Sequence, residues 1–262
     1  MLSALIKLYR RIKNNRYGWF GNYSDWQKAL QKSSGYDARQ ILEKTRSSAI
    51  KVKNGDAVYE RDSVLYDKIE YSWPLLSNLL WIAQRNEGRL SLIDYGGSLG
   101  TSYFQNREYL AGLREVTWSI VEQEEYVKTG QSEIANDSLR FFYNIDEAIA
   151  KKGKHQVLLI SCVLPYLEKP YQFLEEIIKK DFPYIIVDNT YFNPKPADRL
   201  TVQHVPPFYY EASYPAWFLD YNKVRSVFMN KYDLVAEYMN EQFLYFYGEK
   251  INYRGFVMKL KT

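Results

Sequence analysis

The sequence contains few of the residues that most often form metal sites and covalent cross-links. Cys162 is the only cysteine, and His155 and His204 are the only histidines, in 262 residues. A single cysteine excludes an intramolecular disulfide and suits a reducing compartment, so we expect a cytoplasmic protein. One cysteine and two histidines far apart in sequence do not supply the usual zinc ligand sets, so we expect no metal.

Long apolar runs and a strong charge imbalance are also missing. No apolar run reaches the roughly 18 residues of a transmembrane helix. The formal net charge of +4 does not indicate a nucleic-acid partner. Residues 1–16 carry five basic side chains and no acid, too short and too charged for a signal peptide, so we expect at most peripheral membrane contact there. Nothing in the sequence indicates an oligomeric state.

The stretch LSLIDYGGSLGT, residues 90–101, combines a buried strand with a glycine-rich turn. The strand contains Asp94, and the turn that follows contains Gly96, Gly97, Ser98 and Gly100. Closely spaced glycines allow a sharp turn and a close approach of a ligand to the backbone. Residues 102–113 are predicted to be helical, so the turn delivers that ligand to a helix N-terminus. The dinucleotide pattern G-x-G-x-x-G fails here because residues 98 and 101 are Ser and Thr, which disfavours a dinucleotide oxidoreductase.

An acid follows the next predicted strand. Residues 115–121 form an apolar strand pattern, and Glu122 comes directly after it. In a nucleoside-binding βαβ unit, an acid at this position accepts hydrogen bonds from the ribose hydroxyls. Strand, acid, glycine turn, helix, strand and acid together are the arrangement of an S-adenosyl-L-methionine (SAM) site.

The rest of the chain divides into an N-terminal and a C-terminal part. Before residue 89 the patterns predict helices, one of them over 62–72, and no strand, so we expect an N-terminal helical cap at 1–88. From residue 89 to 262, strands and helices alternate as in a parallel sheet with covered faces, and a final strand follows without a helix. Residues 189–219 hold five of the nine prolines and are predicted to form an irregular insertion on the substrate side.

This order of strands is the plan of class I SAM-dependent methyltransferases: a Rossmann-like α/β fold with seven strands, mostly parallel, and an antiparallel last strand. The sequence also resembles a narrower family of methyltransferases found in bacterial surface-polysaccharide loci. The similar stretches are GWFGNYSDW (18–26), YERDSVLYDKIEYSWPLL (59–76), LIDYGGSLGTSYFQNR (92–107), SCVLPYL (161–167), DRLTVQHVPP (198–207) and YPAWF (214–218). The resemblance implies an enzyme that uses SAM, releases S-adenosylhomocysteine (SAH) and methylates a small-molecule or glycan acceptor in surface-polysaccharide assembly.

The candidate cofactor residues come from several strand ends. We expect the backbone of Gly96, Gly97, Ser98 and Gly100 to hold the methionyl part, with Asp94 orienting the loop or the cofactor's amino group. Glu122 is predicted to bind the ribose and Asp146 the adenine. Ser161 and Cys162 are predicted to line the open side of the cofactor, and Tyr71 (or Tyr66) to lie against the sulfonium as a cation–π partner.

The candidate acceptor residues lie in the predicted insertion or just before it. His204 is the predicted general base for a hydroxyl or amine, because a histidine titrates near working pH, and Asp188 is a weaker alternative. Glu211, Tyr214 and Trp217 are predicted to bind a sugar acceptor. His155 opens a buried strand and is predicted to be structural.

Two other functions fit parts of the pattern. Residues 96–100 also match G-x-S-x-G, and Asp188 and His204 follow in the order of an α/β-hydrolase triad, which would make Ser98 the nucleophile of a serine esterase. The helical pattern upstream argues against it, because that nucleophile normally follows several strands of the sheet. A non-catalytic relative that binds a nucleoside would keep the same loop and Glu122.

Overall fold

The computed structural model describes residues 16–36, 38–207 and 209–262. The predicted membrane contact through residues 1–16 therefore falls almost entirely outside the described residues. Within the described part of the chain, no helix is long and apolar enough to cross a membrane.

A seven-stranded sheet forms the centre of the structure, in the order β12-β13-β9-β8-β5-β6-β7. Its strands are β5 (Arg89–Tyr95), β6 (Glu115–Val121), β7 (Leu139–Phe142), β8 (Val157–Ser161), β9 (Tyr184–Thr190), β12 (Tyr232–Phe246) and β13 (Glu249–Leu260). β5 to β9 run parallel, whereas β13 is antiparallel to both β9 and β12. From β5 the chain builds outward to β6 and β7, and then returns to β8 on the other side of β5. Ligands bind at such a switch point, outside the carboxyl ends of the strands.

Helices cover both faces of this main sheet. One face packs against α3 (Ala38–Asn54), α4 (Trp73–Gln84), α5 (Thr101–Leu110), α6 (Glu124–Thr129) and the π-helix Gly130–Ile134. The other packs against α7 (Ile145–Lys152), α8 (Pro170–Ile178) and α9 (Tyr221–Phe228). The strands between them are apolar nearly throughout because both of their faces are buried, as in other parallel sheets. The predicted α/β sheet with an antiparallel last strand is confirmed.

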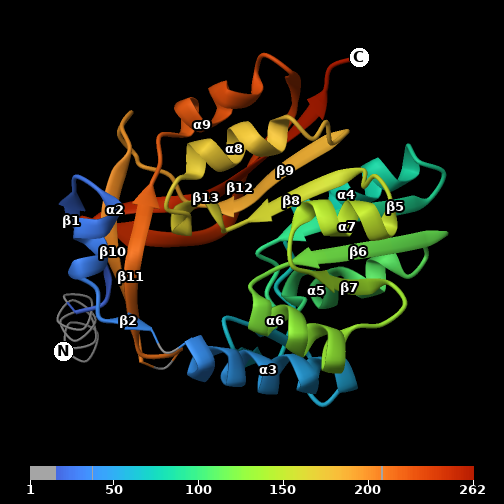
Figure 1. Ribbon diagram of the computed structural model, residues 1–262, viewed down its shortest axis with the longest axis horizontal. Helices are drawn as coiled ribbons and strands as arrows, with labels where there is room; N and C mark the ends of the chain where they lie inside the picture. Colours follow the sequence, from blue (N-terminus) through green and yellow to red (C-terminus); the bar gives the residue numbers. More distant parts are fainter. Residues whose placement is uncertain (1–15, 37, 208) are drawn as a thin grey trace, which may run out of the picture.

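A second sheet is made from two distant parts of the chain. It has the order β1-β10-β11-β2, with β1 (Gly18–Tyr23), β2 (Gly35–Tyr36), β10 (Arg199–Val205) and β11 (Ala212–Phe218). All its pairings are antiparallel, and Figure 1 shows the blue N-terminal strands beside the orange ones. The short helix α2 (Trp26–Gln31) packs Ala29 against Leu200 and Val202 of β10. Two predictions are therefore wrong: strands do occur before residue 89, and much of 189–219 is a regular hairpin.

The predicted helix over 62–72 is also wrong, because a hairpin occupies its first half. β3 (Tyr59–Arg61) pairs with β4 (Val64–Tyr66). Asp62 and Ser63 close the hairpin with φ angles of 51° and 68°. Two consecutive left-handed residues form the two-residue turn that matches strand twist. The helix α4 starts only at Trp73, with Pro74 in its first turn, where the missing N–H of proline costs nothing.

The long β12–β13 hairpin connects the two sheets. The ring of Phe246 stacks on Phe218 of β11 with centroids 3.7 Å apart. Arg199 of β10 lies over the ring of Tyr247, 4.3 Å from its centroid, and also over Phe246. These contacts fix the second sheet relative to the carboxyl ends of the main-sheet strands.

Candidate cofactor and acceptor site

A cavity of about 2790 Å³ lies over the carboxyl ends of the main-sheet strands and is bordered by the second sheet. Small-molecule sites usually have about 300–1,000 Å³. The cavity therefore has room for a cofactor and a sizeable acceptor. Its walls come from the glycine loop, the β3–β4 hairpin, the ends of β8 and β9, and the second sheet.

The glycine loop after β5 is tightly packed at its glycine positions. Gly96 has φ +72°, and a Cβ there would lie 2.6 Å from a methyl carbon of Val163. A Cβ on Gly97 would lie 2.6 Å from the carboxyl carbon of Asp94. Gly100, with φ +100°, precedes the first residue of α5. The glycines thus allow a tight turn directly before the N-terminus of α5, and the predicted contact of the loop backbone with a ligand stays a prediction.

Asp94 lies beneath this loop and is almost completely buried. Its Oδ2 accepts a hydrogen bond of 3.0 Å from Nε1 of Trp118. Burial raises the pKa of Asp94 to about 7, the hydrogen bond from Trp118 opposes the rise, and the negative charge of Glu122 adds to it. A buried acid with this pKa stabilises a cationic group placed nearby.

Glu122 connects the end of β6 to the same loop. Its Oε1 accepts from the backbone N–H of Ser98 at 3.3 Å, and its Oε2 accepts from that of Gln123 at 2.7 Å. Burial raises the pKa of Glu122, and these two hydrogen bonds oppose the rise. The structure therefore brings together Asp94, the loop and Glu122. The ribose contact of Glu122 stays a prediction.

The ends of β8 and β9 form the opposite wall. Cys162 has φ 56°, and its N–H donates to the backbone oxygen of Asp188 at 3.0 Å. The Asp188 carboxylate accepts from the hydroxyls of Tyr238 (3.0 Å) and Ser161 (3.3 Å) and from Nδ2 of Asn240 (3.4 Å). Burial raises the pKa of Asp188 against these hydrogen bonds. Asp188 thus holds this wall together, which differs from the role of a free base.

Asp146 and Tyr71 border the same cavity, at different places. Asp146 lies in the first turn of α7, and its carboxylate pairs with Nζ of Lys180 at 2.5 Å. Tyr71 packs in an aromatic cluster with Trp73 and Tyr109, with ring centroids 4.8 and 5.1 Å away. Their predicted contacts with adenine and sulfonium stay predictions.

The residues predicted to bind the acceptor lie on different faces of the second sheet. Tyr214 is opposite Gln203 in the β10–β11 ladder, and both face Tyr166, which donates to Gln203 Oε1 at 3.0 Å. His204 is the next residue along β10, so it points to the other face, where its ring meets Phe20 at 5.5 Å. Burial lowers the pKa of His204.

Trp217 and Glu211 lie elsewhere. Trp217 packs beside Leu200 and borders a separate cavity of about 360 Å³. Glu211 is exposed just before β11, and among the described residues neither side chain lines the large cavity.

The hydrolase triad is not assembled among the described residues. The contacts of His204 are with Phe20, those of Asp188 are with the wall of β8 and β12, and the N–H of Ser98 is bonded to Glu122. β5 is also the first strand of the main sheet in chain order, so no earlier strand of that sheet precedes the loop.

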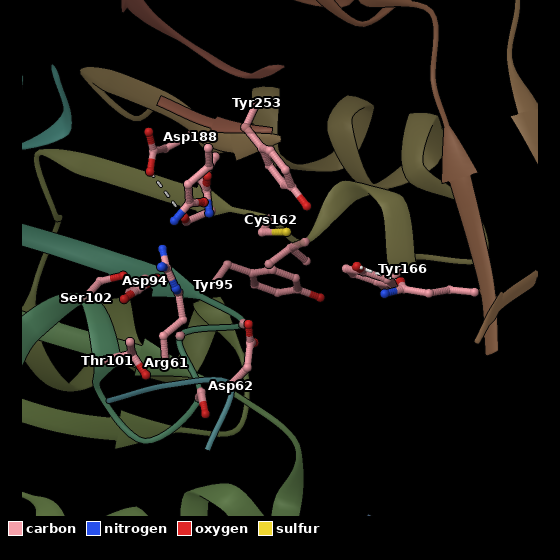
Figure 2. Close-up of a pocket in the computed structure, with 18 of the residues that line it drawn as sticks. Arg61, Asp62, Asp94, Tyr95, Thr101, Ser102, Cys162, Tyr166, Asp188 and Tyr253 are labelled. Carbon is pink, nitrogen blue, oxygen red and sulfur yellow. Dashed lines mark hydrogen bonds between the residues drawn. The ribbon is translucent and has the colours of Figure 1, made fainter. Parts of the chain in front are cut away.

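Sequence reasoning missed the charged residues of the β3–β4 hairpin. Glu60 is buried and accepts a hydrogen bond from the hydroxyl of Thr101, at the start of α5. Burial raises the pKa of Glu60 to about 7, and the hydrogen bond from Thr101 opposes the rise. Arg61 and Asp62 extend into the cavity (Figure 2). The sequence signal was the charged run Glu-Arg-Asp within YERDSV, at and just before the start of the predicted helix over 62–72.

The sequence matches no family model and no curated protein. Solved structures that match include the N-terminal domain of EvdMO1 in the presence of SAH and D-fucose, which is 14% identical. The match covers 87% of this chain and 98% of that chain, with a TM-score of 0.48. Magnesium protoporphyrin IX methyltransferase of Synechocystis PCC 6803 with bound SAM is 12% identical. The match covers 84% of this chain and 97% of that chain, with a TM-score of 0.47. A Burkholderia thailandensis 1,6-didemethyltoxoflavin-N1-methyltransferase is 14% identical. The match covers 88% of this chain and 95% of that chain, with a TM-score of 0.46. At these TM-scores the likeness decides nothing about function, which has to rest on the chain's own geometry.

Proposed function

We propose that this protein is a SAM-dependent methyltransferase acting on a hydroxyl or amine of a sugar or glycan precursor. The observation that carries the proposal is the glycine loop between the buried Asp94 and the half-buried Glu122, at the switch point of a sheet with an antiparallel last strand. Gly97 cannot carry a Cβ because the Asp94 carboxylate lies against it, and Glu122 accepts from Ser98 across the loop. A positively charged sulfonium compound with ribose hydroxyls fits this arrangement of acids and backbone.

The chain's own residues would mainly bind and orient. The cofactor supplies the methyl group and its leaving group. The loop backbone and Glu122 would hold the two ends of the nucleoside amino acid, and the wall at Ser161, Cys162 and Asp188 would direct the acceptor. Such alignment is worth up to roughly 7–11 kcal/mol of barrier reduction. His204 borders the large cavity and stays our candidate base.

A cyclic, hydroxyl-bearing acceptor suits the second sheet. Tyr214 and Gln203 face the cavity wall at Tyr166, so aromatic surface and hydrogen-bonding groups lie together. Aromatic faces combined with such groups are what a sugar ring requires. Together with the resemblance to surface-polysaccharide methyltransferases, this favours a glycan precursor assembled in the cytoplasm.

Calorimetric titration with SAM and SAH tests the proposal, on wild type, Glu122→Ala and the control Glu125→Ala. Glu125 is an exposed acid three residues away, so the control has the same charge change. We expect Glu122→Ala to weaken binding at least tenfold, because a charged acceptor contributes about 1.5–3 kcal/mol, and the control to stay within twofold. A folded wild type that binds neither ligand would overturn the methyltransferase proposal. Binding without methyl transfer to any acceptor would favour the non-catalytic relative.

A further inference from the structure

The cavity is rich in carboxylates and poor in cations. Among the described residues, nine Asp and Glu side chains line it, against three Lys and Arg side chains: Arg61, Lys68 and Lys180. Such a lining favours a ligand with net positive charge and disfavours any anionic part. A ligand that carries one carboxylate besides its cationic groups therefore needs that carboxylate to meet one of these three cations.

Arg61 is the cation best placed for this. Lys180 pairs with Asp146 beside α7, and Lys68 is exposed beyond β4. Arg61 adjoins Glu60, whose bond to Thr101 ties β3 to the helix that follows the glycine loop. Figure 2 shows the Arg61 side chain entering the cavity on the side of Asp94 and Ser102. A guanidinium can bond to a carboxylate through two parallel N–H groups.

Glu70 already bonds to part of this guanidinium. Its Oε2 lies 2.6 Å from Nη2 of Arg61, and the side chain of Glu70 is 46% exposed against 22% for Arg61. The pair is therefore partly open to solvent on the side of Glu70, which weakens its contribution to stability. Arginine has five N–H donors, so a second carboxylate can share or replace Glu70.

We propose that Arg61 binds the α-carboxylate of the amino-acid end of the cofactor, and that Glu70 is a built-in competitor for the same guanidinium. The inference rests on the proposed function and adds to it the residue that distinguishes SAM and SAH from nucleosides without an amino-acid end. The β3–β4 hairpin then provides the carboxylate-binding residue beside the glycine loop, separate from the proposed ribose contact at Glu122.

The test compares two ligands that differ only in the amino-acid end. SAH carries it, and 5′-methylthioadenosine has a methyl group instead. Calorimetric titrations use wild type, Arg61→Gln, Arg61→Lys and Glu70→Gln, with Lys68→Gln as a control that removes one positive charge from the same cavity. Thermal unfolding checks that each variant is folded.

We expect Arg61→Gln to weaken SAH at least tenfold and methylthioadenosine less than twofold. Arg61→Lys should be intermediate, Lys68→Gln should leave both ligands unchanged, and Glu70→Gln should strengthen SAH about twofold to fivefold. If Arg61→Gln does not fold, the test uses Arg61→Lys instead: the proposal then requires that this variant weakens SAH more than methylthioadenosine.

The contrary outcomes separate the two proposals. If wild type binds SAH and Arg61→Gln binds it equally well, the carboxylate role of Arg61 is overturned. The same holds if Arg61→Gln weakens SAH and methylthioadenosine to the same extent. Neither result contradicts the proposed function. Weaker SAH binding by Glu70→Gln overturns its role as competitor. A wild type that binds neither ligand overturns the proposed function and this inference with it.

Discussion

The two halves of the large cavity are built in opposite ways. The half that lies on the main sheet, here called the lower half, is one continuous stretch from β5 to β6. In it, Asp94, the glycine loop and Glu122 follow each other within 29 residues. The upper half, the second sheet, joins residues 18–36 to residues 199–218. Local order therefore fixes the glycine loop and its two acids, whereas contacts between distant segments form the proposed acceptor site. A substitution should affect one half much more than the other.

The strongest test of this division is Gly97→Ala in the lower half. Its Cβ would collide with the buried Asp94 carboxylate at 2.6 Å, so the loop has to move. Overpacking of this kind costs about 1–3 kcal/mol, and we expect SAH affinity to fall on the order of 100-fold. Gly112→Ala is the matched control, because nothing lies within 4 Å of the added carbon. Titration of Gly97→Ala with unchanged affinity would show that the loop does not hold the ligand.

The pH dependence of stability gives a second, smaller effect in the same half. Asp94 ordinarily has a pKa near 3.8, and burial raises the pKa to about 7 in the folded chain. Between these values the folded chain binds more protons than the unfolded chain, so stability falls as the pH rises. We expect the slope of wild type relative to Asp94→Asn to be at most about 1.4 kcal/mol per pH unit.

Urea unfolding of both proteins at pH 5, 6, 7 and 8 measures this slope. The exposed Asp137→Asn serves as the control for loss of one carboxylate. Wild type and Asp94→Asn with parallel pH profiles would mean that the Asp94 carboxyl titrates normally despite its burial.

The smallest effect is expected from the upper half. Tyr214→Phe keeps the ring that lies 5.6 Å from Tyr166 and removes only the hydroxyl. Because Tyr214 belongs to the second sheet, we expect SAH affinity to change less than twofold in calorimetry. A tenfold change would break the division between the two halves.

The same contrast explains what the sequence could predict. The strand, loop and helix around Gly97 are local, and their apolar runs and glycines are visible in one short window. The main-sheet strands were likewise recognisable because both of their faces are buried, which leaves nearly continuous apolar runs. The structure places Asp94, the loop and Glu122 beside one another, while their roles in binding a ligand stay predictions.

The second sheet could not be predicted from the sequence, for a physical reason. β1 pairs with β10 across about 180 residues, and no local pattern records that pairing. His204 shows the consequence: its neighbour Gln203 faces Tyr166, and the period of two in a strand turns His204 to the other face. Had residues 189–219 been irregular, as predicted, no such alternation would have applied. The β3–β4 hairpin was missed because the left-handed tip at Asp62 and Ser63 uses no glycine.

The shared second sheet also constrains how acceptor specificity could be exchanged between related proteins. A chimera that replaced only residues 199–218 would set new β10 and β11 strands against old β1 and β2 edges, with mismatched registers on both sides. A fragment beginning at residue 89 would leave both edges of the β10–β11 hairpin unpaired, which invites aggregation. Residues 18–36 and 199–218 therefore form one module for protein engineering, although some 160 residues separate them in the gene product.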